Sequence, residues 1–228
     1  MAVASLASAA SVPAALRGGS PFSLSDPQKQ LEDLTEHYAL GVLLGLALFV
    51  KSMLGVVAVA ALGAQAARLH PTRSALGGGL AAAAFLAHAA RGLWFAAIEP
   101  AAGVRFFDGD PATRQAMLIF LQHNLLYHHF FNWLYIVFGG MGFALLGWAL
   151  WPQVRRLAAA LGLAATAHAA HFPATLYHYY SVHVLNRRLP MLSLLTETGV
   201  WLFPGLAFLI ASIWLRALSE TAIQEPQR

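Results

Sequence analysis

The chain has 228 residues, of which 58% are hydrophobic and 11% charged, and its mean hydropathy is +0.60. This composition excludes an ordinary soluble domain and indicates an all-α, polytopic membrane protein. Cysteine is absent, which excludes thiolate metal sites and disulfides, and the 14 basic residues form no stripe, which excludes a nucleic-acid partner.

Residues 1–36 precede the first long apolar segment. The first 25 residues combine many Ala and Ser with one arginine and no acid. This composition is typical of an organelle transit peptide and equally of a tail on the membrane surface. From Asp26 the sequence predicts a short amphipathic helix, because Pro27 suits the first helical position and acidic residues follow it. We therefore separate an N-terminal region, 1–36, from a membrane domain, 37–218, and a C-terminal tail, 219–228.

Apolar segments in the membrane domain are long enough to cross roughly 30 Å of hydrocarbon, for which a helix needs about 20 residues. Stretches rich in Arg, Pro and polar residues separate them, and these predict joints. The glycines at 139–142 allow a bend within the third segment. We predict a bundle of about five transmembrane helices, at 39–66, 76–98, 116–150, 157–183 and 191–215, with joints at 68–73, 99–114, 151–156 and 185–190.

The orientation of this bundle depends on the charges at its two faces. Lys and Arg near the span ends divide evenly between the faces. Acidic residues gather on the face that carries the N-terminus. This asymmetry favours an outside or lumenal N-terminus.

The third predicted span contains the stretch "FLQHNLLYHHFFNWLYIVFGG", with three histidines among apolar residues. Positions three or four apart lie on one side of a helix, so Asn124, His128, Asn132 and Tyr135 form one polar stripe, and His129 lies on a neighbouring face. An unpaired polar group costs several kcal/mol in hydrocarbon, so we expect these side chains to face protein or a cavity. The alternative is that they form interhelical hydrogen bonds that only hold the bundle together.

The fourth predicted span also carries histidines on one face. His171 and His178 are seven residues apart and nearly superposed, and Pro173 interrupts the helical hydrogen bonds between them. A kink beside histidines is typical of a helix that borders a cavity.

Charged residues occur within three of the predicted spans. His88 and Arg91 lie one turn apart in the second, and Glu197 and Trp201 lie one turn apart in the fifth. A charge at mid-bilayer costs about 2.5 to 3.5 kcal/mol, so we expect Arg91 and Glu197 to form an ion pair inside the membrane. Lys51 either extends its ammonium to the interface or lines the same cavity.

Histidines on several helices fit three kinds of chemistry. A haem b needs one imidazole from each of two facing helices. A non-haem iron or copper site needs two or three histidines, but "HNLLYHH" lacks the spacing of the histidine boxes of membrane hydroxylases, so the sequence identifies no metal. Proton transfer on a buried lipid needs no cofactor. The haem pairs would come from His88, His128 or His129, and His171 or His178.

Two segments carry a resemblance to a known family. "FLAHAARGLWF" at Phe85–Phe95 and "GVWLFPGLAFL" at Gly199–Leu209 resemble the EXPERA-domain family, in particular its emopamil-binding-protein-like sterol isomerases. The resemblance implies a five-span bundle in which a His and carboxylates move a proton on a sterol double bond, with a Trp near the carbocation. Residue by residue, only His88 and Trp201 carry over. Where the family has Glu before a glycine, this chain has Arg91.

Our first functional expectation is a histidine-lined cavity that binds a hydrophobic small molecule within the lipid bilayer. Its reaction would be double-bond isomerisation of a sterol or isoprenoid without a cofactor. In this reaction His88 would donate or relay the proton, Glu197 would pair or act as base, and Trp201 would stabilise positive charge. The histidines of the third and fourth spans should then converge with His88 and Glu197, and Pro173 and Pro204 should lie beside them.

The second expectation is a haem b subunit of a respiratory or photosynthetic membrane complex, with other membrane subunits as partners. Its ligands would come from several histidines on two spans. A third possibility is a structural subunit whose histidines only form hydrogen bonds. The candidate cofactor-binding residues are His128, His129, His171 and His178.

Overall fold

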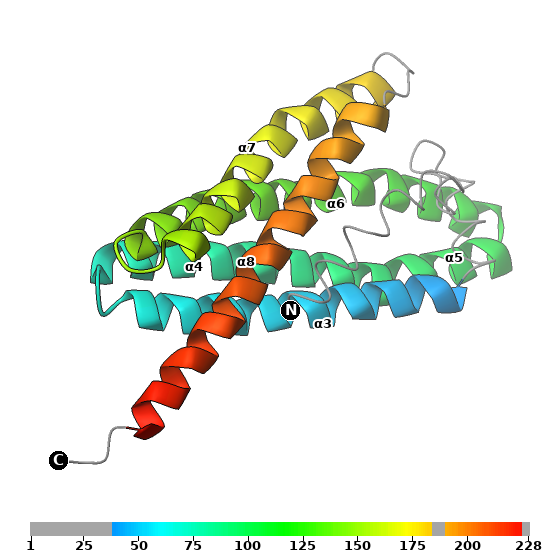
Figure 1. Ribbon diagram of the computed structural model, residues 1–228. Coiled ribbons are helices and arrows are strands. Elements are labelled where there is room, and N and C mark those ends of the chain that lie inside the picture. The colour runs from blue at the N-terminus through cyan, green and yellow to red at the C-terminus, as the bar shows by residue number, and fades with distance from the viewer. Residues whose placement is uncertain (1–37, 184–189, 225–228) are drawn as a thin grey trace.

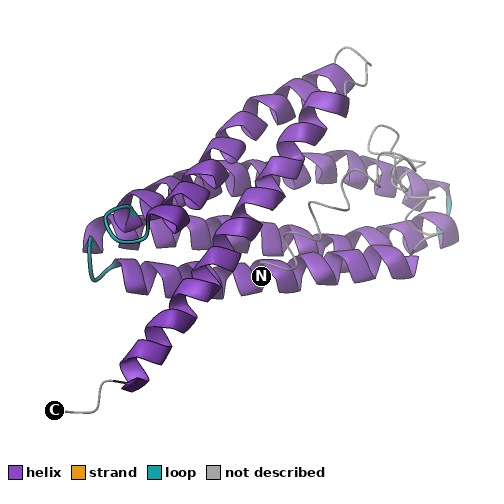
Figure 2. Cartoon of the chain, in the orientation of Figure 1, coloured by secondary structure: helices purple, strands orange, loops and turns teal. Residues whose placement is uncertain are grey.

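A computed structural model describes residues 38–183 and 190–224, which are helical almost throughout (Figures 1 and 2). The all-α prediction is confirmed. The amphipathic helix predicted after Asp26 and nearly all of the joint predicted at 185–190 lie outside the described residues, and the domain limits stay a prediction. The elements are α3 (Tyr38–Ala66), α4 (Pro71–Leu93), the π-helix η1 (Trp94–Ile98), α5 (Glu99–Asp108), α6 (Pro111–Leu150), α7 (Arg155–His183) and α8 (Pro190–Gln224).

Within the described residues, four helical segments are long and apolar enough to cross a membrane. The prediction of about five spans exceeds this number because α7, which contains the predicted span 157–183, is not among them. The buried His168 and His171 lower the hydropathy of α7. The chain is therefore a membrane protein by the length and composition of four segments. They are Tyr38–Ala66, Pro71–Asp108, His129–Leu150 and Thr196–Leu218.

The helices pack mainly against their neighbours in the chain. α4 contacts both α3 and α6, and α7 contacts both α6 and α8. In Figure 1, α3, α4 and α6 run side by side, and α8 crosses them obliquely. Phe85 of α4 lies in the core, with its ring centroid 5.8 Å from Tyr135, 6.3 Å from Phe143 and 6.0 Å from Phe208. Side chains of three helices, α4, α6 and α8, thus meet at one aromatic core.

Glycines allow α4 to lie close to the backbones of its neighbours. A Cβ atom on Gly92 would lie 2.6 Å from the backbone nitrogen of Phe49 in α3, and one on Gly142 would lie 2.5 Å from that of Ala81 in α4. The glycines at 139–142 therefore do not break α6, which is one helix of 40 residues. They permit the close helix contact that small residues provide in membranes.

The joint predicted at 99–114 is wrong over most of its length, because α5 continues α4 through η1. Pro100 has no N–H with which to bond the carbonyl of Ala96, one turn earlier. The helix widens there, and the Glu99 N–H donates to the carbonyl of Trp94, five residues back. The chain leaves helical geometry only between Asp108 and Pro111.

Asp110 caps the start of α6, and this cap should depend on pH. Its carboxylate accepts a hydrogen bond of 2.7 Å from the Thr113 N–H, which lowers the pKa of Asp110. Since the folded-state pKa lies below the ordinary value of about 3.9, the cap stabilises the protein above that pH. Its contribution is lost as the pH falls through the folded-state pKa.

We expect Asp110→Ala to lower the melting temperature at neutral pH, because the Thr113 N–H loses its acceptor. The difference between the two proteins should shrink below about pH 4, where the aspartate becomes protonated. Thermal unfolding of both proteins across this range measures the effect. An equal difference at neutral and acidic pH would contradict the capping role.

Candidate functional site

Three rings from three helices stack at the centre of the bundle. The centroid of His88 in α4 lies 4.4 Å from that of Tyr135 in α6 and 5.1 Å from that of Trp201 in α8. Tyr135 and Trp201 are 5.6 Å apart and nearly parallel. All three side chains are buried. His88 and Trp201, both candidates from the sequence, are thus in contact.

The hydrogen bonds of Ser52 fix the proton on His88. The Ser52 hydroxyl donates to the carbonyl of Leu48 at 2.7 Å, and its oxygen lies 3.2 Å from Nδ1 of His88. A hydroxyl has one proton, so Nδ1 of His88 is the donor in the second bond. A neutral His88 therefore carries its proton on Nδ1 and its lone pair on Nε2.

Lys51 lies inside the bundle. Its side chain is 7% exposed, and Nζ lies 3.4 Å from the centroid of the Trp201 ring. The negative face of the indole offsets part of the cost of burying the ammonium. Of the two alternatives for Lys51, the structure favours the interior position over the interface.

Four charged side chains act on one another in this region, and we call Lys51, Arg91, Glu99 and Glu197 the charged centre. The charge of Arg91 attracts both carboxylates and repels Lys51. Arg91 also donates a hydrogen bond of 3.2 Å to Oδ1 of Asn132 in α6. The two cations and two carboxylates leave the centre formally neutral.

Arg91 and Glu197 are close enough for their charges to interact. Glu197 is exposed at the bundle surface and accepts a hydrogen bond from the indole N–H of Trp201. Trp201 thereby links the charged centre to the three stacked rings. A direct ion pair between Arg91 and Glu197 stays a prediction.

His168 and His171 of α7 lie on its inner side. Nδ1 of His171 is 2.8 Å from the hydroxyl oxygen of Thr196, the residue before Glu197, which brings His171 to the α8 end of the charged centre. His168 bonds the carbonyl of Ala164 at 2.8 Å through Nδ1. Its ring centroid lies 5.3 Å from that of Tyr135. His168 thus also lies against the stacked rings.

The structure brings together only part of the set that the sequence proposes. His88, Trp201, Glu197 and His171 gather from three helices. His129 instead lies against Trp133 of its own helix, at a centroid distance of 6.1 Å. The side chains of the two other candidates, His128 and His178, lie outside the described residues.

The two prolines differ in their surroundings. Pro204 is buried one turn after Trp201, close to the stacked rings in the chain. Pro173 is exposed, although His171 beside it is buried. The prediction that both prolines lie next to the site therefore fits Pro204 better.

Sequence reasoning did not select Ser52, Tyr135 or His168 as site residues. Ser52 follows Lys51 in the middle of an apolar span, and His168 precedes His171 by one turn. Both residues could have been recognised as inward-facing, since a polar side chain within an apolar span must face protein. Tyr135 continued the polar stripe of the third span but gave no sign of its contact with His88.

Within the described part of the chain, no three His, Cys, Asp or Glu side chains are grouped so that they could hold a metal ion. The Tyr135 ring contacts both His88 and His168. The haem hypothesis depends largely on His128 and His178 and stays a hypothesis. A Soret band in the visible spectrum that is lost in His171→Ala would support it.

Comparisons with family models, curated proteins and solved structures found no match for this chain. Its function is therefore inferred from the residues of the charged centre and the stacked rings.

Proposed function

We propose that this membrane protein binds a hydrophobic molecule at the charged centre and shifts a carbon–carbon double bond in it, as in a sterol or isoprenoid. The observation that carries this proposal is the gathering of Lys51, Arg91 and Glu197 in three spans. Each charge costs about 2.5 to 3.5 kcal/mol at mid-bilayer. Apolar side chains would hold the helices together at lower cost, so the presence of three charged side chains here supports a chemical role.

A double-bond shift needs an acid and a base but no oxidant. One proton adds to a carbon of the double bond, and another leaves the carbon next to the resulting cation, so atoms and electrons balance. The Nδ1 of His88 donates to Ser52, so a proton taken up at Nε2 makes His88 the acid that adds a proton to the double bond. The Glu197 carboxylate is then the base that takes the proton that leaves, and the return of this proton to His88 completes the cycle. Glu197 is exposed at the bundle surface, where a molecule dissolved in lipid can reach it. These two groups are our candidates for the proton transfers.

Trp201 lies between these two groups and suits a cationic intermediate. It contacts the His88 ring and donates a hydrogen bond to Glu197. The Lys51 ammonium already occupies one face of its ring, 3.4 Å from the centroid. A substrate cation can use this face only when Lys51 is displaced. Lys51 should therefore compete with cationic ligands.

We expect Lys51→Met to tighten the binding of a hydrophobic tertiary amine, whose ammonium mimics a carbocation, by about tenfold. Trp201→Leu should weaken this binding. Isothermal titration in nanodiscs measures both effects. The matched control is Arg73→Met, which removes the cation 3.7 Å from the ring centroid of Trp148 and should leave amine binding at Trp201 unchanged.

In the same samples, conversion of a sterol or isoprenoid diene tests the proton transfers. His88→Gln and Glu197→Gln should each slow conversion by about 100-fold or more. His123→Gln, at an exposed histidine that bonds the carbonyl of Ile119, serves as control. A protein that neither binds the amine nor converts any such lipid would overturn the proposal.

A further inference from the structure

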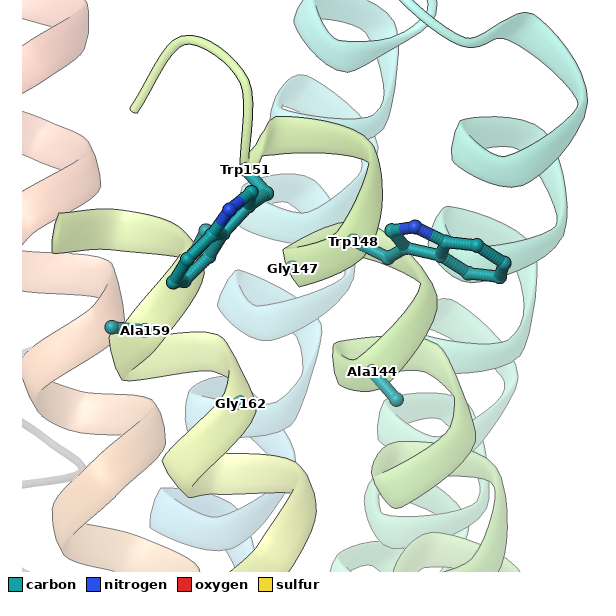
Figure 3. A pocket seen from close by; sticks show the side chains of 7 residues that line it. Ala144, Gly147, Trp148, Trp151, Ala159 and Gly162 are labelled. Carbon is teal, nitrogen blue, oxygen red and sulfur yellow. The ribbon is translucent and has the colours of Figure 1, made fainter. Parts of the chain in front are cut away.

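A groove runs along the outer side of the contact between α6 and α7. One part has a volume of about 490 Å³ and is lined by Gly147, Trp148, Trp151 and Gly162, among others (Figure 3). A second part, of about 550 Å³, shares Ala144 with the first, so the two adjoin along α6. We call the whole the α6–α7 groove.

The groove has the length and lining of an acyl-chain site. Along α6 its lining extends from Ile136 to Trp151, roughly 22 Å at 1.5 Å per residue. This is about three quarters of the hydrocarbon thickness. Small residues form its floor, and a Cβ atom built on Gly162 meets no atom within 4 Å. An extended hydrocarbon chain can therefore lie against the helices without moving them.

Tryptophan and arginine mark one end of the groove. Trp148 and Trp151 are 59% and 52% exposed, as expected for side chains at the level of the lipid headgroups. The guanidinium of Arg73 lies 3.7 Å from the centroid of the Trp148 ring. Arg155 and Arg156 are exposed in the first turn of α7, directly after the turn that follows Trp151.

These arginines lack acidic neighbours in the chain. No Asp or Glu occurs in residues 38–98 or 111–196. Arg155 and Arg156 stand at the start of α7, where the positive end of the helix dipole makes the placement of a cation unfavourable. The first turn of α7 contains no acidic residue that would offset this effect. A bound anion would compensate both the side-chain charges and the helix end.

We propose that the α6–α7 groove binds an anionic phospholipid, with an acyl chain along the groove and its phosphate at Arg155, Arg156 and Arg73. Basic pockets beside transmembrane helices recognise such headgroups. A second helix would fit less well, because close helix packing needs small residues along the whole contact, and both tryptophans project at one end. This lipid site contains none of the four residues of the charged centre, but His168 lines the groove and also lies against Tyr135 of the stacked rings.

Native mass spectrometry of the whole protein, with phosphatidylglycerol and phosphatidylcholine of identical acyl chains, tests the site. We expect retention of phosphatidylglycerol in preference to phosphatidylcholine. Gly162→Leu fills the groove and should reduce retention by about tenfold, since the chain loses its place. The matched control is Gly79→Leu in α4, where a Cβ also meets no atom within 4 Å but which lines no part of this groove.

The headgroup contact has its own test. Arg155→Gln with Arg156→Gln should weaken phosphatidylglycerol binding by about 30-fold, whereas Arg155→Lys with Arg156→Lys should retain most of it. Equal retention of both lipids by the unchanged protein would overturn the proposal. Equal lipid retention by the Gly162→Leu and Gly79→Leu proteins would also overturn it. If the only change in Gly162→Leu is the loss of a dimer, the groove is the contact surface for a second copy of the chain.

Discussion

Replacing Gly142 with leucine should destabilise the bundle by at least about 3 kcal/mol, at the upper end of the range for overpacked cores. A Cβ atom at this position would lie 2.5 Å from the backbone nitrogen of Ala81 and 2.8 Å from its Cβ. Backbone atoms cannot rotate away as a flexible side chain can, so α6 must move off α4. That movement would open the contact beside Phe85 and Phe143 in the core.

Thermal unfolding in detergent should show this loss as a melting temperature lower by about 10 °C. Gly79→Leu is the matched control, because it makes the same change at a position of α4 where a Cβ atom meets no other atom within 4 Å. It should be neutral or stabilising by up to about 1 kcal/mol, through higher helix propensity. Similar losses in both variants would mean that the α4–α6 contact does not depend on Gly142.

Arg91→Leu should cost about 3 kcal/mol, because both carboxylates of the charged centre would lose the cation that attracts them. Asn132 would also lose a donor. In the double variant with Glu197→Leu, one of these carboxylates is removed. The loss should then be smaller than the sum of the single losses by about 1 kcal/mol or more.

Denaturant unfolding of the wild type, both single variants and the double variant measures this coupling. A second cycle with Arg91→Leu and Arg114→Leu is the control. Arg114, in the first turn of α6, donates to the carbonyls of Gly109 and Phe107 and not to a residue of the charged centre. Those two changes should add within about 0.5 kcal/mol. If Arg91 and Glu197 are equally additive, they do not form the pair that their positions in the sequence predict.

Helix ends could be predicted well where the chain changes composition abruptly. The first span was expected at 39–66 and is found at Tyr38–Ala66, because Arg68, His70 and Pro71 follow it at once. The stretch at 99–114 contains equally strong turn signals but is mostly helical. Pro100 lies in the first turn after a widened segment, where the missing N–H disturbs only one bond. Composition alone does not distinguish these two situations.

The number of spans illustrates a second limit. An average hydropathy counts every residue of α7 alike, whichever way it faces. His168 and His171 are buried, whereas Leu163 and Leu176 are among the exposed side chains of the same helix. The segment is therefore less polar toward its surroundings than its average hydropathy suggests. The placement of its histidines on one face indicated this asymmetry, which an average hydropathy does not record.

Contacts within the site were predictable where a residue type is costly in lipid. Arg91 and Glu197 each need an opposite charge nearby, and the charge of each acts on the other. A direct ion pair between them stays a prediction. The bond between Ser52 and His88 was not predictable, because it depends on which side of α3 meets α4. Close approaches such as that of Gly45 to the backbone of Ala96 set that side. The polar Ser52 indicates a side that faces protein but does not identify His88 as its partner.

The widened turn η1 determines which way the following ten residues face. One additional residue in a helical turn rotates everything after it by about 100° relative to a regular helix. With the insertion, Glu99 is 2% exposed and within range of the charge on Arg91. In a regular helix, this carboxylate would point toward another sector of the bundle. The charged centre is thus formally neutral because η1 turns the Glu99 carboxylate toward Arg91, although no side chain of η1 belongs to that centre.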